Sequence, residues 1–145
     1  MGARLLVKRL DPGLPLPRFA HPGDAGLDLH AAQAITLGPH ERGVIGCGLA
    51  VAIPQGYVGL VSPRSGTAVS MGLSMVNTPG VVDSGYRGEV RLALINLDPS
   101  EPIHVKRGDR VAQLVIVPLA PVEVAEVEDL PGSQRGEGGF GSTGR

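Results

Sequence analysis

Short apolar segments alternate with turn-forming residues along most of this chain. In residues 89–94, written EVRLAL, every second residue is apolar, as in a half-buried strand. Breakers such as Asp11-Pro12-Gly13 and Pro54-Gln55-Gly56 separate the segments. The pattern predicts strands at Leu5–Leu10, Ala34–Leu37, Val44–Ile53, Tyr57–Val61, Leu73–Val76, Gly88–Leu97, Ile103–Val105, Arg110–Leu119 and Val122–Val127. Many short strands predict an antiparallel sandwich or barrel, and only Thr67–Met71 is expected to form a brief helical turn.

The chain changes character after Leu130-Pro131-Gly132. Residues 133–145 are rich in glycine and contain a single aromatic residue, Phe140, so they have little to bury. We therefore predict a folded core of residues 1–132 and a flexible C-terminal arm of residues 133–145. The arm also carries two arginines and two hydroxyl side chains. A disordered tail would explain the glycines, whereas the mixture suits a lid over a phosphorylated ligand that bears a ring.

Composition limits the possible function. The 145 residues favour one domain, and 42% are apolar with only 3% aromatic, so Val, Leu, Ile and Ala must build the core. Because the net charge is −1, the chain lacks the charge of a general nucleic-acid binder. Cys47 is the one cysteine and is expected to be a buried, inert thiol. With no signal-peptide core and no run approaching ~20 apolar residues, we expect a soluble, cytoplasmic protein without a membrane partner.

The stretch from Asn77 to Val90 is the most informative for chemistry. Ser84-Gly85 is a plausible two-residue hairpin turn. Such a turn would pair Asp83 with Tyr86 and Val81 with Gly88 on one face. Gly88 would leave space beside the tyrosine ring. The prediction is one surface with a carboxylate, an aromatic floor and a gap, although an ordinary polar hairpin end would look the same.

Three further stretches carry polar groups. Arg64, within Ser62–Thr67, could hold phosphate beside exposed backbone N–H groups, although a capping serine next to a surface arginine is the alternative. Asp24 and Asp28 surround a glycine-containing turn, and either could contact hydrated Mg²⁺. For Asp24 a local turn contact is the favoured interpretation. Gln113 is a polar residue in an apolar run, and the four histidines lack metal-ligand spacing.

Five motifs, taken in order, resemble those of the trimeric dUTPase family. They are Asp24–Leu29, Pro63–Gly66, Gly80–Glu89, Arg107–Leu114 and Arg135–Gly144. The resemblance extends from about Leu5 to the last residues. It implies an all-β fold of the β-clip type, a distorted antiparallel barrel or jelly roll with one short helix. It also implies a homotrimer with composite active sites and Mg²⁺-dependent hydrolysis of dUTP to dUMP and pyrophosphate, which removes dUTP and supplies dUMP for thymidylate synthesis.

The resemblance also implies roles for individual residues. Asp83 matches the carboxylate that activates the water attacking the α-phosphorus, and Tyr86 matches the ring beneath deoxyribose that excludes a 2′-hydroxyl. Asp28 matches the acidic residue near the metal, acting through water. The remaining substrate contacts are Arg64, Ser65, Gly66, Asn77, Val82 and Gln113 in the core and Arg135, Phe140, Gly141, Ser142 and Thr143 in the arm.

Two other functions fit a protein of this kind. A dCTP deaminase on the same fold, either monofunctional or bifunctional, would need a carboxylate placed for proton transfer at the pyrimidine ring. A non-catalytic trimeric binding or signalling module could use the same pocket. The tight Asp83–Tyr86 turn and the glycine-rich arm favour hydrolysis of dUTP over deamination, and the intact motifs argue against the binding module.

Overall fold

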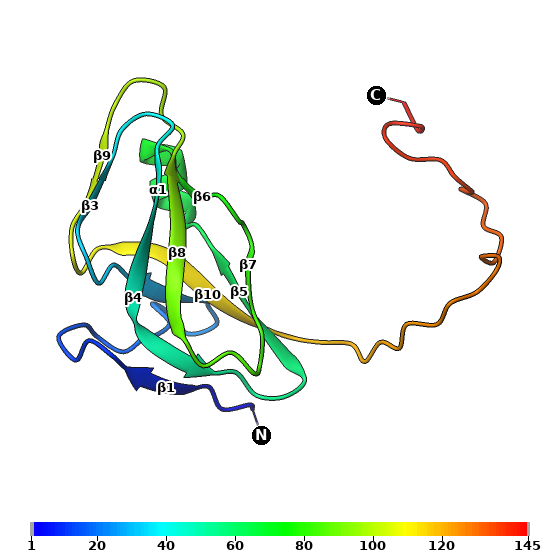
Figure 1. The fold of residues 1–145 in the computed structure, drawn as a ribbon, viewed down its shortest axis with the longest axis horizontal. Helices are drawn as coiled ribbons and strands as arrows, with labels where there is room; N and C mark the ends of the chain where they lie inside the picture. The colour runs from blue at the N-terminus through cyan, green and yellow to red at the C-terminus, as the bar shows by residue number, and fades with distance from the viewer. Residues whose placement is uncertain (1, 145) are drawn as a thin grey trace.

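The computed structural model describes residues 2–144, so Met1 and Arg145, the ends of the predicted core and arm, lie outside it. The described chain is built from antiparallel strands and one short helix (Figure 1). The elements are β1 (Leu6–Arg9), β2 (Gly26–His30), β3 (Ile35–Leu37), β4 (Arg42–Ala52), β5 (Tyr57–Ser62), α1 (Ser65–Met71), β6 (Leu73–Met75), β7 (Gly80–Val82), β8 (Glu89–Asn96), β9 (Ile103–Val105) and β10 (Arg110–Pro118).

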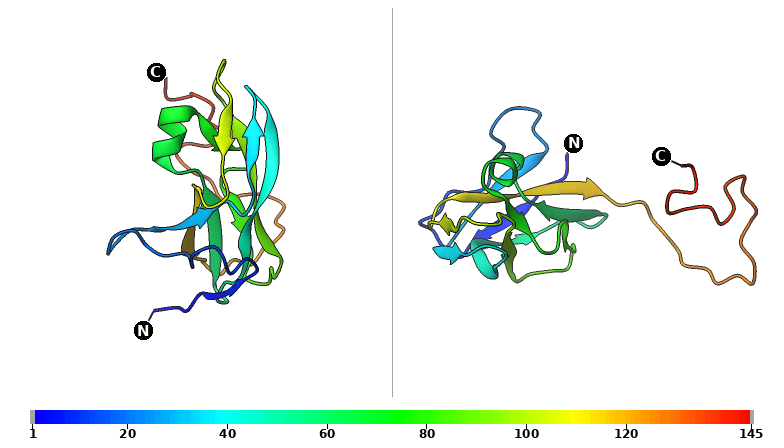
Figure 2. Two further views of the ribbon diagram at one scale, coloured as in Figure 1. Left: turned by 90° about the vertical axis from the view of Figure 1, so that its left-hand side faces the viewer. Right: turned by 90° about the horizontal axis from the view of Figure 1, so that it is seen from above.

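The strands form two four-stranded sheets and one two-stranded sheet. Their orders are β1-β4-β8-β6, β2-β10-β5-β7 and β3-β9, and every pair is antiparallel. The two larger sheets face each other across the core, which Figure 2 shows from two further sides. The predicted antiparallel all-β class with one short helix is confirmed.

Alternation along β8 shows how the sequence specifies the core. Val90, Leu92 and Leu94 point inward and are buried, while the residues between them face outward. Leu114 of β10 is buried in the same core from the opposite sheet. Asn96 is a buried polar residue here, and its side-chain amide donates to the carbonyls of Leu37 and Glu101. Those bonds satisfy the amide at the point where β8 ends.

Two of the predicted segments differ in the structure. The region around Asp28, expected to be a turn, is strand β2, in which Leu27 and Leu29 face the core and Asp28 lies between them. The run was too short to identify by its alternation. The predicted strand at Val122–Val127 is wrong, because this segment has no strand conformation. A strand needs a neighbour for its backbone hydrogen bonds, and none of the described residues pairs with this segment.

The chain leaves the folded body where β10 ends at Pro118. After Leu119, whose N–H still donates to the Gly56 carbonyl at 2.8 Å, the chain extends away from both sheets, as Figure 1 and the right-hand view of Figure 2 show. Along this segment Val122 is 81% exposed and Val124 is 94% exposed. These apolar side chains have no packing partner among residues 2–144, so they form an exposed apolar surface. No helix among residues 2–144 is long and apolar enough to cross a membrane.

Candidate active site

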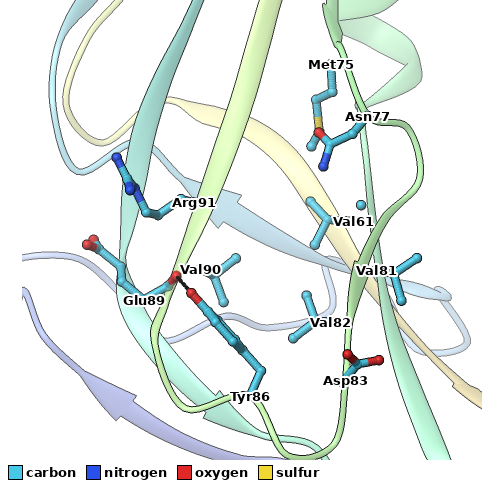
Figure 3. A pocket seen from close by; sticks show the side chains of 11 residues that line it. Val61, Met75, Asn77, Val81, Val82, Asp83, Tyr86, Glu89, Val90 and Arg91 are labelled. Carbon is cyan, nitrogen blue, oxygen red and sulfur yellow. Dashed lines mark hydrogen bonds between the residues drawn. The ribbon is translucent and has the colours of Figure 1, made fainter.

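A small depression of about 190 Å³ lies between β7, the start of β8 and the loop before β7 (Figure 3). We call it the nucleoside depression, after the part of the ligand that the sequence resemblance predicts for its residues. Its inner wall is apolar, and Asn77, Asp83 and Tyr86 add polar groups from its two sides. Its lining residues are Val61, Met75, Asn77, Gly80, Val81, Val82, Asp83, Tyr86, Glu89, Val90 and Arg91. An apolar pocket with a few polar groups is typical of a site for a small ring-bearing ligand.

The turn between Asp83 and Tyr86 forms as predicted, with the Tyr86 N–H donating to the Asp83 carbonyl at 3.1 Å. The strands on either side do not pair with each other, however. Because β7 pairs with β5 and β8 pairs with β4 and β6, Val81 lies opposite Leu60 rather than Gly88. The predicted hairpin ladder is therefore wrong, since each strand finds its partner in a different sheet. Asp83 and Tyr86 still line one depression.

The tyrosine ring is held in place beside a glycine. The Tyr86 hydroxyl donates to the main-chain carbonyl of Glu89 at 2.8 Å (Figure 3). A Cβ atom at Gly88 would lie only 2.5 Å from the Tyr86 hydroxyl oxygen. The prediction that Gly88 leaves space for the ring is thus confirmed. Tyr86 remains 44% exposed, so one side of the ring is available to a ligand.

A second depression of about 400 Å³ lies over β2, β10 and the start of α1. We call it the phosphate depression, after the part of the ligand that the sequence resemblance predicts for its residues. It gathers most of the other predicted core residues, and it is lined by Ala20, His21, Asp24, Ala25, Gly26, Asp28, Arg64, Ser65, Gly66, Arg110 and Gln113. The helix begins at Ser65, and Arg64 is its capping residue without a side-chain cap. Ser65 is therefore in the first turn rather than acting as the cap.

Charges in the phosphate depression are organised by Asp28. Its two carboxylate oxygens lie 3.2 Å from Arg64 Nε and 3.3 Å from Arg110 Nη1. The Gln113 amide donates to the Pro63 carbonyl at 3.1 Å and so fixes the loop that carries Arg64. With Asp24 also in the lining, the two carboxylates and two guanidinium groups of the depression balance in formal charge. The guanidinium N–H donors of Arg64 and Arg110 are therefore what suits the depression to a polyphosphate. Arg110 was missed by the sequence analysis, because its position at the start of an apolar strand suggested only a turn.

The other carboxylate of this region, Asp24, behaves as a turn residue. It accepts a hydrogen bond from the His21 N–H at 2.9 Å. This contact agrees with the local interpretation favoured for Asp24.

The fit of a magnesium ion can be judged from the carboxylates. Among residues 2–144, no three His, Cys, Asp or Glu side chains gather to form a metal cluster. Asp28 offers one carboxylate, and two arginines already contact it. Mg²⁺ usually keeps several waters and binds through one or two carboxylates together with substrate phosphates. The donor set therefore fits an ion that arrives with a phosphorylated ligand.

The nucleoside depression and the phosphate depression share no lining residue. They lie toward opposite edges of one sheet, since the first is built on β7 and the second on β2. Three strand spacings, about 14 Å, separate these edge strands. The structure thus divides the predicted core residues into two groups within the chain.

The predicted arm residues contact neither depression. Arg135 donates to the Gly138 carbonyl at 2.6 Å, and the Ser142 N–H donates to the Gly139 carbonyl at 3.0 Å. Phe140 is fully exposed, and Gly141 and Thr143 lie in the same series of local turns. Residues 133–144 of the arm therefore have their own local hydrogen bonds and no hydrogen bond to residues 2–132.

Cys47 and Arg91 lie outside the predicted set of site residues. Cys47 is buried, and burial, followed by the charge of nearby Glu89, raises the pKa of its thiol to about 12. This confirms a buried thiol that is not a nucleophile at neutral pH. Arg91 also lines the nucleoside depression and was not predicted. Its outward position two residues after Glu89 could have indicated it, but alternation alone does not say which face a ligand uses.

Comparison with known proteins agrees with this geometry. The family model for dUTPase matches residues 13–144. The deoxyuridine 5′-triphosphate nucleotidohydrolase of Mycobacterium leprae is 56% identical over 149 residues, covering 99% of this chain and 97% of that protein. The protein of the same name from Thermobifida fusca is 53% identical over 141 residues, covering 97% of this chain and 79% of that protein.

Solved structures show the same fold. A mutant dUTPase of Staphylococcus bacteriophage 80alpha, determined with dUpNHpp, superposes with a TM-score of 0.90 at 34% identity over 99% of this chain and 100% of that one. A mutant dUTPase from phage phi11 of S. aureus was studied for the coordination of a structural Mg(II) ion. It superposes with a TM-score of 0.82 at 30% identity, covering 90% of this chain and 100% of that one. On its sequence match and its fold, this chain belongs to the dUTPase family.

Proposed function

We propose that this chain hydrolyses dUTP to dUMP and pyrophosphate at sites assembled between the chains of a homotrimer. The observation that carries the proposal is the division of the site into a nucleoside depression and a phosphate depression that share no lining residue. A ring-shaped trimer would bring the nucleoside depression of one chain to the phosphate depression of its neighbour.

The nucleoside depression is suited to deoxyuridine. Asn77 and the backbone near Val82 would bind the edge of uracil, while the Tyr86 ring would lie against deoxyribose and leave no room for a 2′-hydroxyl. Asp83 is exposed at the rim, where it can orient a water and accept its proton. The water oxygen would bond to the α-phosphorus as the bond to the α,β-bridging oxygen breaks, so that pyrophosphate leaves.

The phosphate depression would hold the triphosphate through Arg64, the first turn of α1 at Ser65 and Gly66, and Gln113. Asp28 would keep the Arg64 side chain in position and contact the hydration shell of the metal. Bound Mg²⁺ would neutralise charge on the triphosphate.

The C-terminal segment supports the trimer. Val122 and Val124 are almost fully exposed in one chain, as expected for a segment that packs on a neighbour. On the outer face of β4-β8-β6, the half-exposed Val44 and Val76 flank Ala93, which gives a second apolar surface for a partner. Residues 133–145 would form the closing arm beyond the folded core, with Phe140 stacking on the base and Arg135, Gly141, Ser142 and Thr143 reaching the phosphates. The cytoplasm, where a thiol such as Cys47 stays reduced, is the proposed location.

The direct test is pyrophosphate release from dUTP, dCTP, dTTP and UTP with Mg²⁺ present. We expect dUTP to be the strongly preferred substrate and the product to be dUMP. Deaminated product from dCTP would assign the chain to the deaminase alternative. Binding of dUTP without release of pyrophosphate would indicate a non-catalytic module.

A further inference from the structure

Glu89 begins β8 directly after the nucleoside turn, and it has no role in the reaction described above. Its main-chain carbonyl accepts the hydroxyl of Tyr86 at 2.8 Å. Its carboxylate points the other way, toward β4 and out of the depression (Figure 3). There its Oε1 accepts the Gly48 N–H at 3.0 Å. One residue therefore connects the tyrosine ring to a strand on the far side of β8.

Strand β4 is shaped to receive this carboxylate. The register of β4 against β8 shifts in a bulge. Gly46 pairs with Arg91 and Ala50 pairs with Glu89, so β4 advances four residues while β8 advances two. Gly48 lies in this bulge with a φ of 69°, a conformation that favours glycine. A Cβ atom at Gly46 would collide with Glu89 Oε1, so the missing side chain leaves the slot for the carboxylate. Bulges beside binding sites commonly redirect a side chain in this way.

The bulge is itself anchored from the opposite side. The Gly48 carbonyl accepts the N–H groups of Leu10 at 2.8 Å and Asp11 at 2.9 Å. Gly48 is thus fixed between the end of β1 and the side chain of Glu89. Because the Glu89 carboxylate and carbonyl belong to one residue, binding the carboxylate restricts the rotation of the peptide group that accepts the Tyr86 hydroxyl.

We propose that Glu89 is a positioning residue for sugar selection, and this rests on the proposed function of the site. By binding Gly48, Glu89 fixes its own carbonyl, and the carbonyl holds the Tyr86 ring at the distance that admits deoxyribose and excludes ribose. The Glu89 side chain, which points out of the depression to Gly48, does not itself touch the nucleotide. Its effect is on the ratio of the kcat/KM values for dUTP and UTP, because a ring that can move away tolerates a 2′-hydroxyl.

The test compares three substitutions in the full-length protein. In Glu89→Ala the acceptor for Gly48 is lost, and the dUTP-to-UTP ratio of kcat/KM is expected to fall about tenfold. In Glu89→Gln the amide oxygen still accepts the Gly48 N–H, so the ratio should stay at the wild-type value. Glu89→Asp keeps the charge but is one methylene too short to reach Gly48, so it should behave like Glu89→Ala.

Glu41→Ala is the matched control, because Glu41 Oε2 also accepts a backbone N–H, that of Gly38, at 3.0 Å, and it does not line the nucleoside depression. It should leave the ratio unchanged. A purely structural role for Glu89 would lower both kcat/KM values equally, through a smaller folded fraction.

An unchanged ratio in folded Glu89→Ala would overturn the inference, and so would an equal fall in Glu41→Ala. If Glu89→Ala does not fold, the dUTP-to-UTP ratios of Glu89→Gln and Glu89→Asp are compared instead. A lower ratio in Glu89→Asp than in Glu89→Gln supports the positioning role, and equal ratios contradict it. A wild-type chain that releases no pyrophosphate from dUTP would overturn the proposed function and this inference with it. An unchanged ratio in an active variant overturns the inference alone.

Discussion

The two depressions of this chain hold their polar groups in different ways. In the phosphate depression, Asp28 holds two guanidinium groups before any ligand arrives. In the nucleoside depression, Asp83 is exposed and Tyr86 lies over apolar side chains, held by its hydroxyl and by the space at Gly88. The phosphate side is organised by charge and the nucleoside side by shape. Affinity for triphosphate and choice of nucleoside should therefore respond to different substitutions.

The largest effect is expected at the acidic residue of the nucleoside depression. Asp83→Asn removes the proton acceptor while keeping the size of the side chain, so kcat for dUTP should fall about 10³-fold. Binding of dUTP should persist, since the apolar wall and the phosphate depression are intact. Steady-state turnover and equilibrium binding measure the two quantities. Turnover at the wild-type level would exclude Asp83 as the base.

Removal of the arm should have the next largest effect. A chain ending at Gly132 keeps both depressions and every strand, so it should fold and assemble. Its kcat/KM for dUTP should fall about 100-fold, because the site is no longer closed over the nucleotide. Thermal unfolding should be unchanged within a few degrees. Undiminished kcat/KM would show that the arm is an ordinary tail.

Arg64→Ala tests the phosphate side alone. Losing one charged contact to phosphate should lower kcat/KM about 30-fold. The fall should be equal for dUTP and UTP, because both carry the same triphosphate. A change in the dUTP-to-UTP ratio would mean that the two depressions are not separate in function.

Tyr86→Ala tests the nucleoside side. Unlike Arg64→Ala, it should change the preference for dUTP over UTP. The dUTP-to-UTP ratio of kcat/KM should fall about tenfold, because the ring no longer closes the 2′ position. Gly88→Ala should have a smaller effect, about threefold, by displacing the Tyr86 hydroxyl without removing the ring. Ratios that stay at the wild-type value in both folded variants would assign sugar selection elsewhere.

The sequence predicted the fold better than it predicted how the site is divided. Strands β8, β9 and β10 were identified because alternation and flanking turns are local properties of the chain. The turn at Ser84-Gly85 was also identified, for the same reason. The strands on either side of the turn were wrongly predicted to pair with each other. Strand pairing depends on how distant segments pack in the two sheets, and β7 and β8 belong to different sheets. That information is not present in the turn.

The missed features have related causes. Strand β2 is short, and the Asp-Gly content around it resembled a turn more than a strand. Val122–Val127 alternates loosely like a strand but has no partner strand among residues 2–144, and alternation alone does not reveal whether a partner strand exists. The resemblance implied composite active sites, but the five motifs did not show which core residues lie together within one chain, and the fold separates those residues across a sheet. A linear motif carries no information about which chain supplies it.

The most direct test of the account mixes two impaired chains, Asp83→Asn and Arg64→Ala, under conditions in which trimers form at random, and measures turnover at dUTP concentrations well below KM, where each parent is far less active than the wild type. In every mixed ring, one junction joins an intact nucleoside depression to an intact phosphate depression. Equal mixing should therefore restore about one quarter of wild-type turnover. Differently tagged chains, purified in sequence over both tags, verify that mixed trimers are present. If those trimers are no more active than the two parents, both depressions of one chain serve the same site and the composite site is wrong.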